Sequence, residues 1–277
     1  MSVAFAVFTS DPNLLQCELS RLEADVCLSE AQPFNAVGVG AYAQEDVLLH
    51  RHPAPPAFRS LSTLWPRLDS EALLYHGRVL PLGILPEENT QPFRYHRWLF
   101  CHQGAVRGFP LVRPRLLASL PEFLQRQVRG DTDSELVFAF FLKLLRDTGR
   151  MDDPLLEPPL AAQLLGRTVR LVEQLSAEAG ASKTSELNCI ATNGLMLIAS
   201  RYGSAPLAYA LLEGTARCER CGLDASMTDS RPIVRAHRRR KTVAIASHAV
   251  RPSSWIEIPE GTAIAVGRDL NVQRLPI

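Results

Sequence analysis

Hydrophobic and polar positions divide the chain into strands at the start, helices in the middle and strands again at the end. The run 3–9 is apolar and β-prone and stops at Ser10-Asp11-Pro12, which predicts a buried first strand. Further strands are predicted at 37–42, 47–50, 72–75 and 98–102, the first two as a hairpin around residues 44–46. Apolar residues at helical spacing predict one early helix over 14–28.

The middle of the chain has the spacing of amphipathic helices. The pattern predicts helices over 114–128, 131–146 and 158–177, and Asp131 or Thr132 is expected to cap the second. Strands return at 188–193 and 195–200 around Asn193-Gly194, a strong hairpin signal, and again at 242–246 and 263–266. Strands before and after a block of helices predict a layered α+β fold, because strict βαβ alternation is absent.

The composition of the chain argues against several classes of protein but does not indicate a function. The 277 residues are 46% hydrophobic and 21% charged, which is ordinary for a globular protein of one large or two small domains. The net charge of +1 argues against nucleic acid as a partner, and no apolar run reaches the roughly 18 residues of a membrane helix. Six cysteines in a chain of this length do not suggest a disulfide framework, and the start lacks a basic signal region, so we expect a cytoplasmic protein.

Five short blocks carry the chemistry. The first is the strand that starts at Ser2, and the third is His76-Gly77-Arg78. The remaining blocks are Asn35-Ala36-Val37-Gly38-Val39-Gly40, then Asn89-Thr90-Gln91-Pro92-Phe93 followed by Trp98-Leu99-Phe100-Cys101-His102-Gln103-Gly104, then Gly130-Asp131-Thr132-Asp133-Ser134-Glu135. Ala246-Ser247-His248 and the spacing from Trp255 to Pro259 add a weaker sixth signal.

In this order and spacing the blocks resemble the class II glutamine amidotransferases, which are N-terminal-nucleophile (Ntn) hydrolases. The resemblance spans nearly the whole chain and implies one domain over residues 1–277, built as a four-layer α/β/β/α sandwich of two antiparallel sheets flanked by helices. The branch it is most similar to is the stand-alone amidohydrolases that cleave γ-glutamyl amides. It implies no cofactor.

The resemblance assigns roles to five residues. Ser2 stands where the family has its cysteine nucleophile, whose own α-amino group serves as the base. Gln103 and Gly104 stand at the oxyanion-hole positions, where the family has an asparagine side chain and a glycine N–H. Arg78 would bind the substrate α-carboxylate and Asp133 the α-ammonium group.

Several positions depart from the family pattern. Ser2 replaces a cysteine, Gln103 is one methylene longer than asparagine, and Pro81, Gln91 and Val37 replace a threonine, a histidine and an aspartate. Because catalysis needs the nucleophile and the oxyanion hole jointly, the favoured interpretation is a non-catalytic protein that keeps part of a glutamine or γ-glutamyl pocket. Such a protein would act as a binding or scaffold subunit, and its partners would be an amino-acid or γ-glutamyl ligand and another protein. The alternative is an active Ntn amidohydrolase that uses Ser2.

Simpler interpretations stand beside these. Arg78 can be a strand-end arginine in a salt bridge, and Asp133 a first-turn helix acid. His76 and His102 follow apolar strands and are predicted to be satisfied core histidines, and Cys101 and Cys189 are expected to be buried apolar residues. Pro53-Ala54-Pro55-Pro56 and the residues 152–159 are predicted loops, the first as a lid or an interface.

Cys218-Glu219-Arg220-Cys221 has the spacing of a zinc knuckle. A structural zinc site needs four ligands, no second cysteine pair follows, and His237 and His248 are the only downstream candidates. The sequence therefore favours no metal, with a plain turn or a redox-sensitive thiol pair in its place. The basic run Arg238-Arg239-Arg240-Lys241 is expected to be a solvated loop, with binding of nucleic acid or an acidic partner as the alternative.

Overall fold

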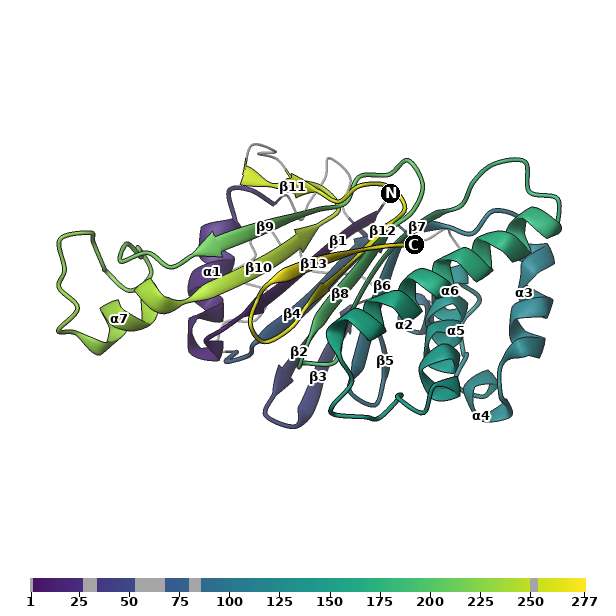
Figure 1. Cartoon of the computed structure of the whole chain (residues 1–277), viewed down its shortest axis with the longest axis horizontal. Coiled ribbons are helices and arrows are strands. Elements are labelled where there is room, and N and C mark those ends of the chain that lie inside the picture. The colour runs from purple at the N-terminus through teal and green to yellow at the C-terminus, as the bar shows by residue number, and fades with distance from the viewer. Residues whose placement is uncertain (1, 27–33, 53–67, 80–85, 250–253) are drawn as a thin grey trace.

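The computed structural model describes residues 2–26, 34–52, 68–79, 86–249 and 254–277. Their strands form two antiparallel sheets (Figure 1). The first sheet has the strand order β11(Ile256–Glu257), β9(Ala208–Glu213), β10(Lys241–Ala246), β1(Ser2–Thr9), β4(Ala72–Arg78), β2(Ala36–Ala43) and β3(Asp46–His52). The second has the order β13(Val272–Pro276), β12(Thr262–Val266), β8(Leu197–Arg201), β7(Glu186–Thr192), β6(Trp98–Ala105) and β5(Phe93–Tyr95).

The two sheets pack face to face, and β1 shows how the sequence specifies this. Successive side chains of a strand point to opposite faces. Ala4, Ala6 and Phe8 belong to the core between the sheets, where they join Leu99 and Ile190 of the second sheet. The alternate residues of β1, from Val3 to Val7, face outward into a different hydrophobic cluster. Because both faces of β1 are covered, its sequence is a continuous apolar run rather than an alternating one.

Helices cover the two outer faces. On the first sheet, α1(Leu15–Leu22) buries Leu15, Leu19 and Leu22 against the outward residues of β1. On the second sheet, α3(Phe109–Ser119), α5(Asp133–Asp147) and α6(Pro158–Glu178) share a core with β6, β7 and β8 (Figure 1). Short helices complete the described chain: η1(Pro12–Leu14), α2(Pro86–Asn89), α4(Glu122–Gln125) and α7(Pro232–Arg239). The predicted four-layer α/β/β/α sandwich is confirmed.

The helix expected over 114–128 is wrong. Helix α3 begins earlier, at Phe109, and ends at Ser119, and α4 starts only after Pro121. The ring of a proline restricts the preceding residue to extended conformations, and Leu120 accordingly has φ −79° and ψ 144°. The expected helix over 14–28 is also shorter, because α1 ends at Leu22.

The basic run is the second correction. Residues up to Arg239 belong to α7, Lys241 begins β10, and Arg240 between them is buried. The Arg240 guanidinium lies 2.6 Å from the Glu18 carboxylate of α1, and both side chains are almost fully excluded from solvent. The run is therefore a helix end and a buried ion pair rather than a solvated loop. No helix among the described residues is long and apolar enough to cross a membrane.

Candidate functional site

Three of the predicted site residues meet at the start of β1. Ser2, Gln103 and Gly104 line an open cleft of about 360 Å³ between the ends of the two sheets. The other lining residues are Glu186, Ala205, Pro206, Ser247 and His248. The strand β1 brings Ser2 to this cleft, and β6 brings Gln103 and Gly104. Residues 101 positions apart in the chain thus share one site because the sheets pack face to face.

Gly104 occupies a position that excludes a side chain. Its φ is +131°, a conformation that L residues rarely adopt. A Cβ atom added there would lie 2.0 Å from the main-chain carbonyl oxygen of Glu186 on the neighbouring strand β7. Only glycine allows this approach of backbone to backbone at the edge of the cleft.

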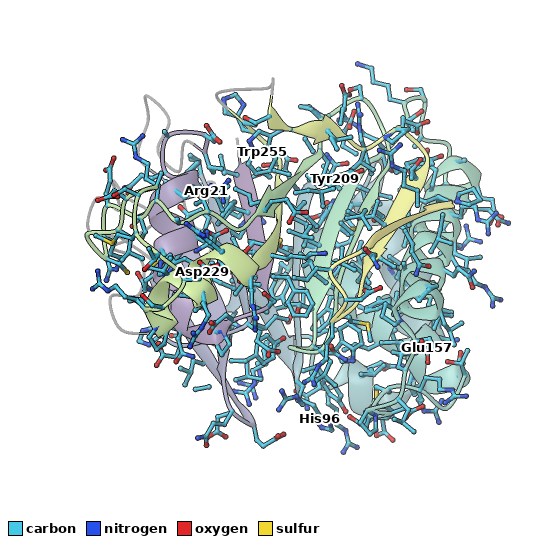
Figure 2. All side chains as sticks on the ribbon, turned by 60° about the vertical axis from the view of Figure 1, so that its left-hand side comes forward. Arg21, His96, Glu157, Tyr209, Asp229 and Trp255 are labelled. Carbon is cyan, nitrogen blue, oxygen red and sulfur yellow. The ribbon has the colours of Figure 1, made fainter. Side chains whose placement is uncertain are left out.

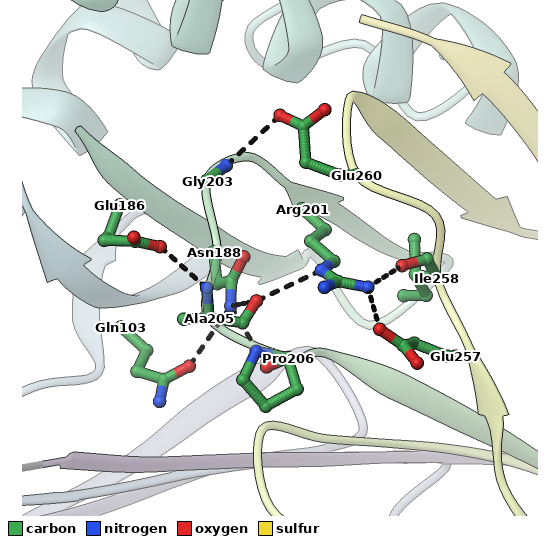
Figure 3. A network of polar contacts seen from close by, with 10 residues as sticks. All are labelled: Gln103, Glu186, Asn188, Arg201, Gly203, Ala205, Pro206, Glu257, Ile258 and Glu260. Atoms are coloured by element: carbon green, nitrogen blue, oxygen red, sulfur yellow. Dashed lines mark hydrogen bonds and ion pairs between the residues drawn. The ribbon is translucent and has the colours of Figure 1, made fainter. Parts of the chain in front are cut away.

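The amide of Gln103 is held by hydrogen bonds on both of its ends. Its Nε2 donates to the main-chain oxygen of Ser2 at 3.4 Å, and its Oε1 accepts from Nδ2 of Asn188 at 3.3 Å. Figure 3 shows Asn188 between Gln103 and the carbonyl groups of Ala205 and Pro206, to which Nδ2 also donates at 3.1 Å each. The Gln103 side chain therefore links Ser2 to Asn188, and Asn188 in turn links to the segment that follows β8.

Glu186 and Asn188 are site residues that the sequence analysis did not single out. Glu186 accepts hydrogen bonds from the Ser204 hydroxyl at 2.6 Å and from the Ala205 N–H at 2.8 Å, which fixes the loop beside the cleft. Burial acts to raise the pKa of the Glu186 carboxyl, but these hydrogen bonds outweigh it and the pKa is lowered. One signal was present in the sequence: Asn188 is a polar residue in an otherwise apolar strand, and a buried amide needs partners.

Arg78 lies next to Ser2 in the first sheet. The two residues are directly paired in the register of β1 and β4. Among the described residues the guanidinium has no ion pair or hydrogen bond, and the charged group that acts on it is the Asp133 carboxylate. Burial lowers the pKa of Arg78, and the nearby Asp133 carboxylate partly offsets this. An arginine remains protonated under all such shifts, so Arg78 presents a half-buried positive charge.

Asp133 carries a negative charge, opposite to that of Arg78, and lies on a helix that covers the second sheet. It is the first residue of α5, and Thr132 caps that helix by accepting from the Glu135 N–H at 3.4 Å. The two carboxylate oxygens of Asp133 accept from the N–H groups of Val106 and Ser134, at 2.8 Å each. These bonds orient the carboxylate, and an ammonium group can still bind its remaining lone pairs. The capping and ligand roles are thus compatible in geometry.

The two core histidines differ. His102 is satisfied, because its Nδ1 lies 2.9 Å from the Ser134 hydroxyl and its Nε2 lies 2.9 Å from the Glu186 carbonyl oxygen. His76 is buried as well, and the main chain of His102 is the polar group that its ring approaches. Burial lowers the pKa of both imidazoles, and the positive charge of Arg78 lowers them further.

Two of the departures from the family pattern are built into the core. Gln91 is fully buried and exchanges two hydrogen bonds with the His102 main chain, accepting from its N–H at 2.6 Å and donating to its carbonyl at 3.1 Å. Val37 is buried in the outer hydrophobic cluster of the first sheet. Pro81 and the predicted lid at Pro53–Pro56 lie outside the described residues.

The weak sequence signal at Ala246-Ser247-His248 also reaches the cleft. The Ser247 hydroxyl accepts from the Ala4 N–H at 2.9 Å, and the Ser247 N–H donates to the Ala4 carbonyl at 3.0 Å. These bonds fix the end of β10 beside β1. His248 follows on the exposed side, so it lies at the Ser2 cleft rather than with the cysteine pair.

Comparison with known proteins identifies the family of the chain. A sequence model described as "Glutamine amidotransferases class-II" matches residues 33–272, which is most of the chain. The chain belongs to the class II glutamine amidotransferase family. The matched range of this family begins after β1, so it does not include Ser2.

The chain is similar to individual proteins of this family in sequence and in structure. It is 27% identical over 263 residues to a "Probable glutamine amidotransferase DUG3" of Saccharomyces cerevisiae, covering 86% of this chain and 71% of the yeast protein. A class II domain protein from Silicibacter pomeroyi superposes with a TM-score of 0.61 at 20% identity, covering 99% of this chain and 98% of that one. A predicted glutamine amidotransferase from Pseudomonas aeruginosa gives 0.58 at 16% identity, with 98% of each chain covered. The two structural similarities establish the shared fold.

Cys218 and Cys221 lie away from the Ser2 cleft. They belong to the segment between β9 and β10, together with His237 of α7. The strands β1 and β10 are antiparallel, and the residue before β10 is level with the Thr9 end of β1. Seven residue steps separate Thr9 from Ser2, which is about 23 Å along the strand. The cysteine pair is therefore no part of the candidate amidotransferase site.

Proposed function

We propose that this protein binds glutamine or a γ-glutamyl compound through Arg78 and Asp133 and does not hydrolyse it at a useful rate, acting as a binding or scaffold subunit. The observation that carries the proposal is the position of Arg78: it is paired in register with Ser2, has no ion-pair partner among the described residues, and has a carboxylate of opposite charge nearby. Membership of the class II glutamine amidotransferases supports glutamine chemistry for the ligand.

The charges match an amino-acid backbone. A free α-amino acid carries a carboxylate and an ammonium group on one carbon, and a γ-glutamyl group keeps both. A guanidinium binds a carboxylate through two parallel hydrogen bonds, and the oriented Asp133 carboxylate accepts from an ammonium group. With the backbone of the ligand held there, its side-chain amide extends toward Ser2, which lines the adjoining cleft.

The loss of turnover is argued from the nucleophile and from Gln103. We place Ser2 at the position of the family's cysteine, and a hydroxyl is a weaker nucleophile than a thiol near neutral pH. One of the two N–H groups of the Gln103 amide donates to the Ser2 carbonyl, and the amide oxygen accepts from Asn188, so these two partners set the orientation of the amide. A donor engaged in this way is not aimed at a developing oxyanion, and losing such a donor costs about 10²–10³ in rate.

Calorimetry tests the pocket. We expect glutamine, glutamate or a γ-glutamyl dipeptide to bind the native protein, and we expect Arg78→Met and Asp133→Asn each to weaken binding by about 10-fold or more, because a hydrogen bond to a charged group contributes about 1.5–3 kcal/mol. Arg146→Met is the matched control, because that arginine is half-exposed at the far end of α5. Binding that both site variants leave unchanged would contradict the proposed clamp.

Hydrolysis assays separate the nucleophile from the oxyanion hole. We expect no turnover in the native protein and only slow turnover in Ser2→Cys. Adding Gln103→Asn to Ser2→Cys should raise the rate about 10²-fold, because the shorter amide cannot remain tied to Ser2 and Asn188. If Ser2→Cys alone restores full activity, the oxyanion hole is intact and the argument from Gln103 is wrong.

The alternative is an active Ntn amidohydrolase with Ser2 as its nucleophile. The observation in its favour is that Ser2 lines an open cleft together with both oxyanion-hole positions, Gln103 and Gly104. Such an enzyme needs the free α-amino group of Ser2 as its base. Intact mass of natively expressed protein checks this condition, and a processed chain that turns over glutamine and loses this activity in Ser2→Ala would establish the alternative.

We also propose a cytoplasmic location. All the described cysteines are free thiols, which is consistent with a reducing compartment. Expression of a tagged chain followed by fractionation tests this assignment.

A further inference from the structure

Four metal-binding side chains meet where α1 faces the segment between β9 and β10. We call this segment, residues 214–240, the β9–β10 excursion; in Figure 1 it projects beyond α1 at one end of the first sheet. Cys17 comes from α1, Cys218 and Cys221 from the start of the excursion, and His237 from α7. One ligand atom from each of the four lies within 4.8 Å of all the others. A tetrahedral site at the Cys218-x-x-Cys221 pair needs two more ligands, and the structure supplies His237 and the upstream Cys17, which precedes Cys218 by 201 residues.

The sulfur atoms have the spacing of shared coordination rather than of a disulfide. Sγ of Cys17 lies 3.5 Å from Sγ of Cys221, and all three cysteines are free thiols. A disulfide requires about 2.05 Å between the sulfur atoms. Two sulfur ligands of a tetrahedral zinc ion with bonds of about 2.3 Å lie about 3.8 Å apart, close to the separation found here.

His237 offers one nitrogen to the cluster and uses the other to fix its ring. Its Nδ1 lies 2.9 Å from the Ile233 carbonyl oxygen one turn earlier in α7, so Nδ1 carries the proton and donates. Its Nε2 then carries a free lone pair, is buried, and has no hydrogen-bond partner among the described residues. A buried nitrogen without a partner is costly, and zinc-binding histidines commonly show this same pairing of one ring nitrogen with a carbonyl.

The cysteine pair sits on a tight turn. The main chains of Cys218 and Leu223 exchange two hydrogen bonds of 2.9 Å each, and the Gly222 N–H donates to the Glu219 carbonyl at 3.1 Å. Gly222 has φ +63°, in the left-handed region that glycine tolerates best. The turn thereby closes on itself and presents both thiols toward α1, where Cys17 is buried.

The excursion has too little hydrophobic core to hold itself in place. Its own cluster contains three buried apolar residues, Ala216, Leu223 and Val234. Segments with so small a core usually depend on a disulfide or a metal ion. The buried pair of Glu18 and Arg240 anchors only the end of the excursion to α1. Figure 2 shows Arg21 of α1 and Asp229 of the excursion on the same side of the molecule, far from Glu157 at the start of α6.

We propose that Cys17, Cys218, Cys221 and His237 bind one zinc ion as a structural site that fastens the β9–β10 excursion to α1. Three sulfur ligands and one imidazole favour zinc among the common divalent ions. Four protein ligands fill a tetrahedral site and leave no position for water, so the ion stabilises the fold and takes no part in catalysis. On binding, the three thiols release their protons to solvent as the zinc–sulfur bonds form, and the imidazole binds in its neutral form.

Metal content of the full chain, purified under reducing conditions with zinc supplied, is the first test. We expect about one zinc ion per chain in the native protein, and a loss of about tenfold or more in Cys218→Ser combined with Cys221→Ser. Cys101→Ala is the matched control, because that thiol is buried between the sheets, away from the cluster. Native protein that holds less than about a tenth of an equivalent, or a double variant that keeps its zinc, overturns the site.

Measurements on the native chain keep the test decisive if the variants do not fold. We expect added cobalt to give the visible bands of tetrahedral coordination together with thiolate-to-metal charge transfer. Removing zinc with a chelator should increase hydrogen exchange in residues 214–240 and in α1 while leaving α5 and α6 unchanged. A Cys17–Cys221 disulfide in freshly isolated protein, with no metal uptake after its reduction, would refute the proposal, as would cobalt spectra without thiolate bands.

Discussion

Gly104→Ala tests the close packing that shapes the candidate site. The substitution places a methyl group 2.0 Å from the Glu186 carbonyl oxygen, where ordinary contacts begin near 3.4 Å, so the two strands must separate by more than an ångström. Holding a non-glycine residue at φ +131° costs about 1–3 kcal/mol, and displacing packed structure costs about 1–3 kcal/mol more. We expect a loss of about 2–6 kcal/mol in the free energy of unfolding.

Gly149→Ala is the matched control. Gly149 follows α5 with φ +70°, and no atom lies within 4 Å of the position its Cβ would take. Only the conformational cost of about 1 kcal/mol applies there. Urea unfolding followed by circular dichroism measures both variants against the native protein. Equal losses at the two positions would refute the reasoning, because the contact with Glu186 would then contribute nothing.

Two further predictions concern buried charge. Burial lowers the pKa of His102 below the unfolded value of about 6.5, so the unfolded chain binds more protons near and below that pH, and stability falls as the pH drops. From pH 6.5 to 5.5 the loss in unfolding free energy is up to about 1 kcal/mol, and urea titrations should show that His102→Gln reduces it; an unchanged pH dependence in this variant would contradict the assignment. Glu18→Leu and Arg240→Met should each cost about 3–5 kcal/mol of unfolding free energy, since each leaves a buried charge unpaired, whereas the double variant should recover most of the loss; additive losses in a double-mutant cycle would contradict this.

Much of the layered fold could be predicted from periodicity. The apolar run of β1, the hairpin of β2 and β3, and the helices α5 and α6 follow from patterns of period 2 or 3.6 and from clear boundary residues such as Thr132 and Gly194. The predictions were wrong where one local signal competed with another. Pro121 divides the expected middle helix, and a run of basic residues hides the buried Arg240.

The candidate site could be predicted only in part. Ser2, Gln103 and Gly104 do lie together, and Arg78 pairs with Ser2 in register, as the order of motifs indicated. Glu186 and Asn188 were missed because their importance depends on a loop, 203–206, that packs against them from the next strand.

The sequence by itself determined most of the strands, the helices α5 and α6, and which motifs of the family are present, because these depend on neighbours in the chain. Only the tertiary structure decided which distant side chains meet. Nothing local in Cys17 distinguishes it from a buried apolar residue of α1, and nothing local in Gly104 shows that a carbonyl of β7 lies against it. Packing two sheets and two helix layers brings residues about 200 positions apart within reach, and that information resides in the fold as a whole.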